Sequence, residues 1–319
     1  MKGKKNRQSG AAGFLADTGD IRERKKEERG MKLENQFLCV EIAELGAEVI
    51  RIFDRQKNTD VLWEGDPAYW KRHSPVLFPN VGKTFSSQVL IEGNTFPTVQ
   101  HGFARDSVFT CVSSSGEEAL FCLSSSEDSK KVYPYEFELY IRYVLMGKEL
   151  TVEWQVKNCS DRKMYFTIGG HPAFRFAGKD EKKEDYLLKF PGKEALTYIL
   201  IDPETGTGVP DRTYPLELEE EMCPVTEEMF LRDALIFDEG QIGEVWLCRK
   251  DGTPYVGMRC KGFPSFGIWS VKDAPFVCLE PWQGRCDNIG FAEEISRKPG
   301  VVELPKNEIF IKSYQIIVA

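Results

Sequence analysis

The sequence predicts an all-β protein, built as a large antiparallel β-sandwich with a few short helices. Short segments that alternate apolar and polar residues recur along the chain, and turn residues separate them. Long helical segments between the strands are absent, which argues against a parallel sheet of βαβ units. Hydrophobic residues make up 41% of the 319-residue chain, enough to fill a sizeable core between two packed sheets.

The clearest element is a hairpin over residues 136–156. Its first half alternates strictly, so that Phe137, Leu139, Ile141 and Tyr143 lie on one face of a strand. Gly147 marks the turn, and the returning segment 150–156 alternates in the same way. We therefore expect these two strands to be neighbours in one sheet.

The remaining strands are shorter, and glycines such as Gly46 and Gly116 separate them. Pro281 is predicted to end the strand that precedes it. In chain order, strands are predicted at residues 36–43, 48–54, 61–63, 107–113, 119–124, 187–190, 195–201, 234–237, 245–249, 256–260, 265–271, 276–279 and 308–318. Short helices are predicted at residues 67–71, 227–232 and 291–295.

Residues 1–30 differ from the rest of the chain. They hold nine Lys/Arg and five Asp/Glu and offer little to bury, so we expect a disordered tail or an added leader. No Pro-, Gly- or Ser-rich linker divides the remainder of the chain. Residues 31–319 are therefore expected to form a single domain, present as a monomer or a homodimer.

Composition excludes several classes of function. The net charge of −8 argues against a broad nucleic-acid-binding face. No apolar run approaches the roughly 20 residues of a membrane span. The nine cysteines form no CxxC pair, so free thiols in a reducing compartment are expected, and we expect a cytoplasmic protein.

One stretch, residues 164–174, stands out as a candidate site. A β-rich run leads into Gly169 and Gly170, and then His171 and Pro172 follow. Paired glycines allow close backbone approach, and proline blocks a regular continuation. The histidine is therefore expected on a constrained turn at a strand end, where it could move a proton near neutral pH.

Two further stretches carry residues suited to the same chemistry. His101 precedes Gly102, and Glu280 ends an apolar run, where a carboxylate is costly unless it is paired or lies at the edge of a cleft. A salt bridge from Glu280 to Arg285 or Arg259 is the structural alternative to a role as general base.

Other polar residues have equally plain alternatives. Arg72 could bind a polar ligand or lie on the surface, and His73 is expected to be structural. Binding of a metal is the rival use of the histidines and Glu280. The close ligand spacings HxH and HExxH are absent, so we expect no metal and no other cofactor.

Taken together, these stretches resemble the aldose 1-epimerase (galactose mutarotase-like) family, and within it the LacX-like branch. The resemblance runs from about residue 33 to 317. It rests on motifs in family order: Arg72 with the block 74–79, residues 101–105, residues 170–174, and residues 280–282. Each motif alone is weak, whereas the ordered set is specific.

The resemblance implies a β-supersandwich fold and an isomerase that interconverts the α and β anomers of a hexose. His171 would be the general acid and Glu280 the general base. His101 and Arg72 would bind the sugar, and Asp233 is the best match to an aspartate that contacts it. Trp282 and Phe174 are expected to stack on the pyranose. Galactose specificity does not carry over, because the LacX-like branch differs around the cleft.

Two alternatives remain open at this point. The first is an epimerase for a hexose 6-phosphate, which needs a cluster of basic residues at the cleft rim. The candidates for that cluster are Lys71, Arg72, Lys83, Arg105, Arg175 and Arg285. The second is a sugar-binding or regulatory protein without turnover, although such a protein needs no matched acid and base.

Overall fold

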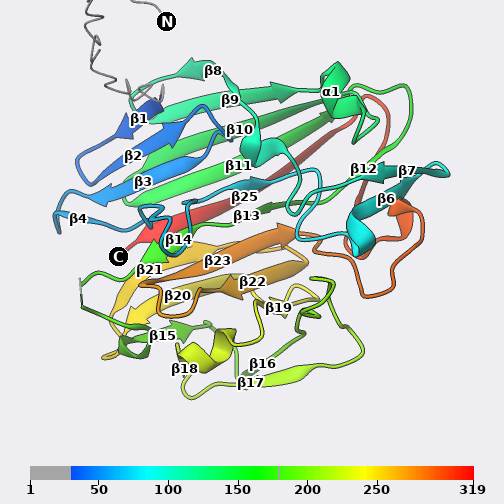
Figure 1. Ribbon diagram of the computed structural model, residues 1–319. Helices are drawn as coiled ribbons and strands as arrows, with labels where there is room; N and C mark the ends of the chain where they lie inside the picture. Colours follow the sequence, from blue (N-terminus) through cyan, green and yellow to red (C-terminus); the bar gives the residue numbers. More distant parts are fainter. Residues whose placement is uncertain (1–29, 179) are drawn as a thin grey trace, which may run out of the picture.

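The computed structural model describes residues 30–178 and 180–319, and its named strands pair antiparallel throughout (Figure 1). The largest sheet has nine strands in the order β18-β15-β20-β21-β25-β11-β10-β9-β8. Their bounds are β8 Thr110–Ser114, β9 Glu118–Ser124, β10 Phe137–Met146, β11 Glu149–Asn158, β15 Tyr186–Lys189, β18 Met222–Pro224, β20 Glu244–Arg249, β21 Pro254–Arg259 and β25 Ile309–Val318.

A six-stranded sheet forms the second layer and carries the candidate site. Its order is β19-β22-β23-β13-β5, and β14 also pairs with β23. The bounds are β5 Val76–Leu77, β13 Ile168–Gly170, β14 Ala173–Arg175, β19 Leu235–Phe237, β22 Ser265–Trp269 and β23 Phe276–Gln283.

Smaller sheets and short helices complete the described part of the chain. A four-stranded sheet holds β1 Gly30–Glu34, β2 Leu38–Ala43, β3 Val49–Asp54 and β4 Thr59–Asp60. Three two-stranded sheets pair β6 Gln88–Ile91 with β7 Asn94–Pro97, β12 Met164–Phe166 with β24 Val302–Leu304, and β16 Ala195–Tyr198 with β17 Tyr214–Glu217. The helical turns are η1 Phe85–Ser87, η2 Ala104–Asp106, α1 Glu127–Lys130, η3 Lys183–Asp185, η4 Glu227–Phe230 and η5 Ile295–Arg297. None of these helices is long and apolar enough to cross a membrane.

The core lies between the nine-stranded and six-stranded sheets. The inward face of β11, which includes Val152 and Trp154, belongs to the same buried cluster as Ile268 of β22 and Leu279 of β23. Strand alternation explains this cluster: every second residue of β11 is buried, and in β23 Val277 and Leu279 face it while Phe276 and Cys278 belong to a separate cluster. The predicted sandwich of antiparallel sheets is therefore confirmed.

The hairpin predicted over residues 136–156 is confirmed as β10 and β11, with Ile141 opposite Trp154. Most of the other predicted strands are found within a few residues of their expected bounds. All nine cysteines are free, as expected. The hairpin β6–β7, which projects at one end of the molecule (Figure 1), was not predicted, because its two strands are short and mostly exposed or half-exposed.

Several predictions about individual elements were wrong. Residues 67–71 form turns rather than a helix, and residues 291–295 enter η5 only at their last residue. Residues 61–63 form no strand and contribute only an isolated bridge from Leu62 to Phe174. The tail predicted at residues 1–30 lies outside the described residues apart from Gly30, which already pairs with Ala43 in β1.

Pro281 does not end its strand, because β23 continues to Gln283. The Leu279 N–H points toward β14 and donates to the Pro172 carbonyl at 3.2 Å. Two residues on, Pro281 faces the same side, where the turn between β13 and β14 interrupts the pairing. Its missing N–H therefore removes no ladder hydrogen bond.

Candidate active site

Apart from Phe174, the residues that were expected to act on the sugar all line one cleft of about 600 Å³. Glu280 and Trp282 come from β23, and His171 comes from the turn between β13 and β14. Arg72, His101 and Asp233 come from three separate loops that precede β5, η2 and β19. The six-stranded sheet thus brings together residues that lie far apart in the sequence.

Glu280 lies at the floor of the cleft, and strand alternation explains why. Val277 and Leu279 of β23 face the core, so Cys278, Glu280 and Trp282 face the cleft side of the sheet. The Glu280 side chain is only 1% exposed, and its Oε2 has no hydrogen-bond partner among the described residues. It pairs with neither Arg285 nor Arg259, whose described partners are Asp238 for the first and Glu149 and Glu244 for the second.

His171 meets Glu280 directly. Its Nε2 lies 3.2 Å from the Glu280 Oε2, and both side chains are buried. Trp70 stacks on the imidazole with ring centroids 4.8 Å apart, and Trp269 packs edge-on at 5.6 Å. The backbone N–H of His171 donates to the Pro75 carbonyl, which holds the turn in place.

Burial sets the protonation of this pair. It raises the pKa of the Glu280 carboxyl well above its usual range, and the nearby Asp233 carboxylate raises it further. Burial also lowers the pKa of His171 to about 3. The free pair therefore holds one proton over a wide pH range, and these shifts place it on Glu280 rather than on His171.

His101 is held in a fixed orientation beside His171, with ring centroids 5.5 Å apart. Its Nδ1 accepts the Gly82 N–H at 3.1 Å, so the proton of the neutral ring lies on Nε2. Burial lowers the pKa of His101, and the charges of His171, Arg105 and Arg72 lower it further. A neutral His101 suits donation of a hydrogen bond, which matches its expected role in binding.

The backbone around His101 is constrained as well. His101 has φ +67°, a value that few non-glycine residues adopt. At the neighbouring Gly102, a Cβ would lie 2.2 Å from the Phe78 carbonyl oxygen, so only glycine fits. Asp233, which also lines the cleft, has a positive φ of +71° as well. Such strained positions recur at ligand sites.

Trp282 is largely buried under the cleft, and two glycines make room for its indole. A Cβ would lie 2.3 Å from the ring at Gly267 of β22 and 2.5 Å from it at Gly169 of β13. The expectation that Phe174 stacks on a sugar is wrong, because Phe174 is fully buried in the core. Its neighbour Ala173 takes the alternate face of β14, so Phe174 must point inward.

Sequence reasoning missed several residues that line the cleft. Trp70 and Trp269 supply the aromatic faces that were expected from Phe174, and Gln100 and Asp202 add polar groups. Trp269 could have been found, because it shares a strand face with Gly267, whereas Asp202 lies in a loop without a signal. His73 lies outside the cleft beside Glu48, as expected for a structural histidine.

Three metal-binding side chains also meet at the floor of the cleft. The donor atoms of His171, Cys278 and Glu280 all lie within 4.8 Å of one another. Burial raises the pKa of the Cys278 thiol, and Glu280 raises it further. A cation would have to displace the protons of both the thiol and the carboxyl, so this trio is better suited to holding protons than a metal.

This fold is shared with galactose mutarotase-like proteins of known structure. A galactose mutarotase related enzyme from Lactobacillus acidophilus superposes with a TM-score of 0.86 at 28% identity, covering 91% of this chain and 97% of the other. A galactose mutarotase-like protein from Lactobacillus casei superposes with a TM-score of 0.83 at 26% identity, covering 91% and 100%.

Sequence comparison identifies the family. The model of the family described as aldose 1-epimerase matches residues 30–239. The chromosomal protein LacX of Lactococcus lactis is 31% identical over 300 residues, which cover 90% of this chain and 99% of that protein. The chain belongs to the aldose 1-epimerase family and resembles its LacX members.

Proposed function

We propose that this protein is an aldose 1-epimerase, which interconverts the α and β anomers of a hexose by opening and closing its ring. The observation that carries the proposal is the buried pair of His171 and Glu280, which lies in the cleft with Nε2 and Oε2 3.2 Å apart. The ring oxygen and the anomeric oxygen of an aldose are bonded to the same carbon. An acid and a base must therefore be close neighbours to reach both.

In the proposed mechanism, Glu280 accepts the proton of the anomeric hydroxyl while His171 donates a proton to the ring oxygen. The C1–O5 bond breaks and leaves an open-chain aldehyde. Rotation about the C1–C2 bond then presents the other face of the carbonyl. The ring closes when O5 attacks C1, with His171 taking the proton back and Glu280 returning its proton to the new anomeric hydroxyl.

The neighbours of the pair fit this chemistry. The reaction needs one proton on the pair. Burial places that proton on Glu280 in the free protein, so it must pass to the adjacent His171 Nε2 before His171 can protonate the ring oxygen. The Nε2–H of His101 would bind a sugar oxygen, and Arg72 and Asp233 would bind hydroxyls. Trp70 and Trp269, which hold the imidazole, also offer apolar faces to the pyranose.

Anomer exchange on a panel of free hexoses, measured by NMR in dilute buffer, tests the proposal. Wild type should accelerate exchange, and His171→Asn and Glu280→Gln should each lower kcat by roughly 10²–10⁴-fold. The double variant should lose little more than either single variant, because the two residues act as one unit. Full activity in both single variants would overturn the mechanism, and loss of activity with EDTA would favour a metal at the Cys278 trio.

The alternative function is sugar binding without turnover. Binding alone explains His101, Arg72 and Asp233, but it gives no reason to bury an ionisable carboxyl against an imidazole. Measurable sugar binding together with no acceleration of exchange for any hexose tested would establish this alternative.

A further inference from the structure

One rim of the cleft carries more positive charge than the described residues neutralise. The side chains of Arg72 and Arg105 are 18% and 16% exposed, and both approach the single carboxylate of Asp106, at 2.8 and 3.7 Å. Lys71 lines the same cleft. Within residues 30–178 and 180–319, no acidic side chain lies within ion-pair distance of Lys71. This rim, composed of Lys71, Arg72 and Arg105, therefore has a net positive charge.

Arg105 is incompletely satisfied at this rim. Its Nη2 donates to the Gln100 carbonyl at 2.7 Å, but its buried Nε has no hydrogen-bond partner among the described residues. Burial lowers the pKa of Arg105 to about 10, and repulsion by Arg72 contributes to this shift. An anion between the two guanidinium groups would relieve the repulsion and provide acceptors for their unused donors.

The rim lies where the substituent on C5 of a bound hexose would extend. In the proposed mechanism the ring oxygen contacts His171, and C5 is bonded to that oxygen on the side away from C1 and Glu280. His101 borders His171 on one side, and Arg72 and Arg105 are close enough to both histidines to lower their pKa values. The group on C6 would thus meet the arginines.

Resting on the proposed epimerase function, we propose that the natural substrate is a hexose 6-phosphate, whose phosphate binds to Arg72, Arg105 and Lys71. Two arginines and a lysine match the charge and the planar bidentate geometry that a phosphate dianion favours. The acidic residues Asp202 and Asp233 also line the cleft, where they suit hydroxyl groups rather than a second anion.

Of the other basic residues that flank the sequence motifs, Lys83 also lines the cleft, where its side chain lies beside Gly206. Arg175 and Arg285 do not serve this role. Arg175 approaches Glu64 and does not line the cleft. Arg285 is buried and bonds to Asp238 and Asn288. A hexuronate also carries an anion at C6, but its single negative charge matches three cations less well than a phosphate does.

Calorimetric titration tests the proposal independently of turnover. The probes are glucose, galactose, their 6-phosphates and glucuronate, each titrated into the full chain at low ionic strength. We expect the 6-phosphates to bind at least tenfold more tightly than the free sugars, with an affinity that falls as salt is added. Anomer exchange on the same compounds should show the same order in kcat/KM.

Substitutions locate the phosphate site. Arg105→Gln should raise the Kd of the 6-phosphates at least fivefold more than that of the free sugars. The exposed Lys71→Gln variant should show the same preference, to a smaller degree, without risk to folding. Lys272→Gln and Arg297→Gln remove the same charges from exposed positions outside the cleft and should change neither Kd.

The two proposals fail in different ways. If free sugars bind and exchange as well as their 6-phosphates, the proposed phosphate site is wrong and the proposed epimerase function is unaffected. Tight binding of the 6-phosphates without any exchange would support the site and overturn the epimerase. A preference for glucuronate, or equal effects of Lys71→Gln and Lys272→Gln, would also overturn the phosphate site.

Discussion

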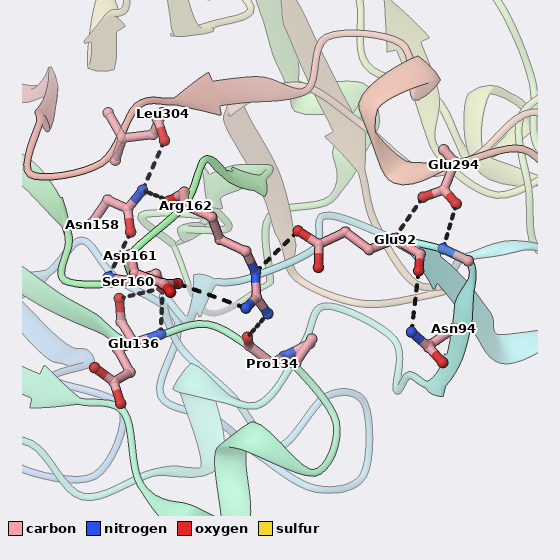
Figure 2. Close-up of polar contacts among 11 residues, drawn as sticks. Glu92, Asn94, Pro134, Glu136, Asn158, Ser160, Asp161, Arg162, Glu294 and Leu304 are labelled. Atoms are coloured by element: carbon pink, nitrogen blue, oxygen red, sulfur yellow. Dashed lines mark hydrogen bonds and ion pairs between the residues drawn. The ribbon is translucent and has the colours of Figure 1, made fainter.

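Two buried polar side chains in this molecule, Asn158 and Glu280, differ in how far hydrogen bonds satisfy them. Asn158, at the end of β11, is 0% exposed and uses every hydrogen-bonding group of its amide (Figure 2). Its Nδ2 donates to the carbonyls of Arg162 and Leu304 at 2.8 and 2.9 Å, and its Oδ1 accepts the Ser160 N–H.

Glu280 is as deeply buried, yet its Oε2 has no hydrogen-bond partner and the adjacent His171 leaves Nδ1 unpartnered among the described residues. An unsatisfied buried polar group costs about 1–3 kcal/mol, and more when it is charged. At the junction of Asn158 with Ser160, Arg162 and Leu304, here called the Asn158 junction, the polar groups stabilise the fold. At the floor of the cleft they stay free for a ligand. The contrast separates structural from functional burial in one chain.

The largest expected effect tests whether Asn158 stabilises the fold and Glu280 does not. Each side chain is replaced, and the free energy of unfolding is measured. Asn158→Ala should lower it by about 3 kcal/mol, because two carbonyls and one N–H lose their partner. Glu280→Gln should leave it unchanged or raise it, because a neutral amide replaces a buried ionisable group. Urea unfolding followed by circular dichroism measures both.

The rate of anomer exchange should rank the same two variants in the reverse order, with Glu280→Gln losing activity and Asn158→Ala keeping it. Folded Asn158→Ala should keep wild-type anomer exchange per active site, since Asn158 does not line the cleft. Equal loss of stability in both variants would show that Glu280 is a structural group, and the contrast between the two sites would fail.

The pH dependence of stability sharpens the comparison. Above pH about 6.5 the unfolded chain has released the protons of both His171 and Glu280, whereas the folded pair still holds one. The folded state then binds more protons, so stability should fall by up to about 1.4 kcal/mol per pH unit, until the raised pKa of Glu280 is passed. Glu280→Gln should remove this alkaline slope.

His171 determines how the free energy of unfolding depends on pH under acidic conditions. Below pH about 4.3 the unfolded chain protonates both groups, while the folded pair keeps one proton until the His171 pKa of about 3 is reached. Stability should therefore fall as the pH drops through this window, and His171→Asn should remove that part of the acid slope. Between the two windows the pair contributes no slope. Unfolding curves from about pH 3 to about pH 9 for wild type and both variants test this pattern, and identical slopes in all three would contradict it.

The smallest effect is expected at the edge of the Asn158 junction. Arg162 ties this junction to the β6–β7 hairpin through Glu92 at 3.0 Å, and it donates to the Pro134 carbonyl at 2.8 Å (Figure 2). Because this ion pair is 42% and 52% exposed, Arg162→Gln should lower the free energy of unfolding by less than about 1 kcal/mol. A shift of only a few degrees in Tm, with unchanged anomer exchange, is expected. A larger loss would show that the hairpin depends on this contact.

The sequence by itself determined the β-sandwich, because period-two alternation in segments such as β10 and β11 depends only on which face of a strand is buried. It also marked His171, Glu280 and their companions by their setting among glycines and prolines. It misplaced Phe174 and the end of β23, since the face of a three-residue strand and the tolerance for Pro281 depend on the neighbouring strands.

Only the tertiary structure decided which polar residues meet. The contact of His171 with Glu280 joins residues that are far apart in sequence, and long-range strand pairing of β13 and β14 with β23 creates it. Packing also separates two arginines that both follow glycine-containing motifs: Arg285 is buried against Asp238, whereas Arg105 lies at the rim of the cleft. Local pattern sets burial and secondary structure, whereas the convergence of charges depends on packing between distant segments.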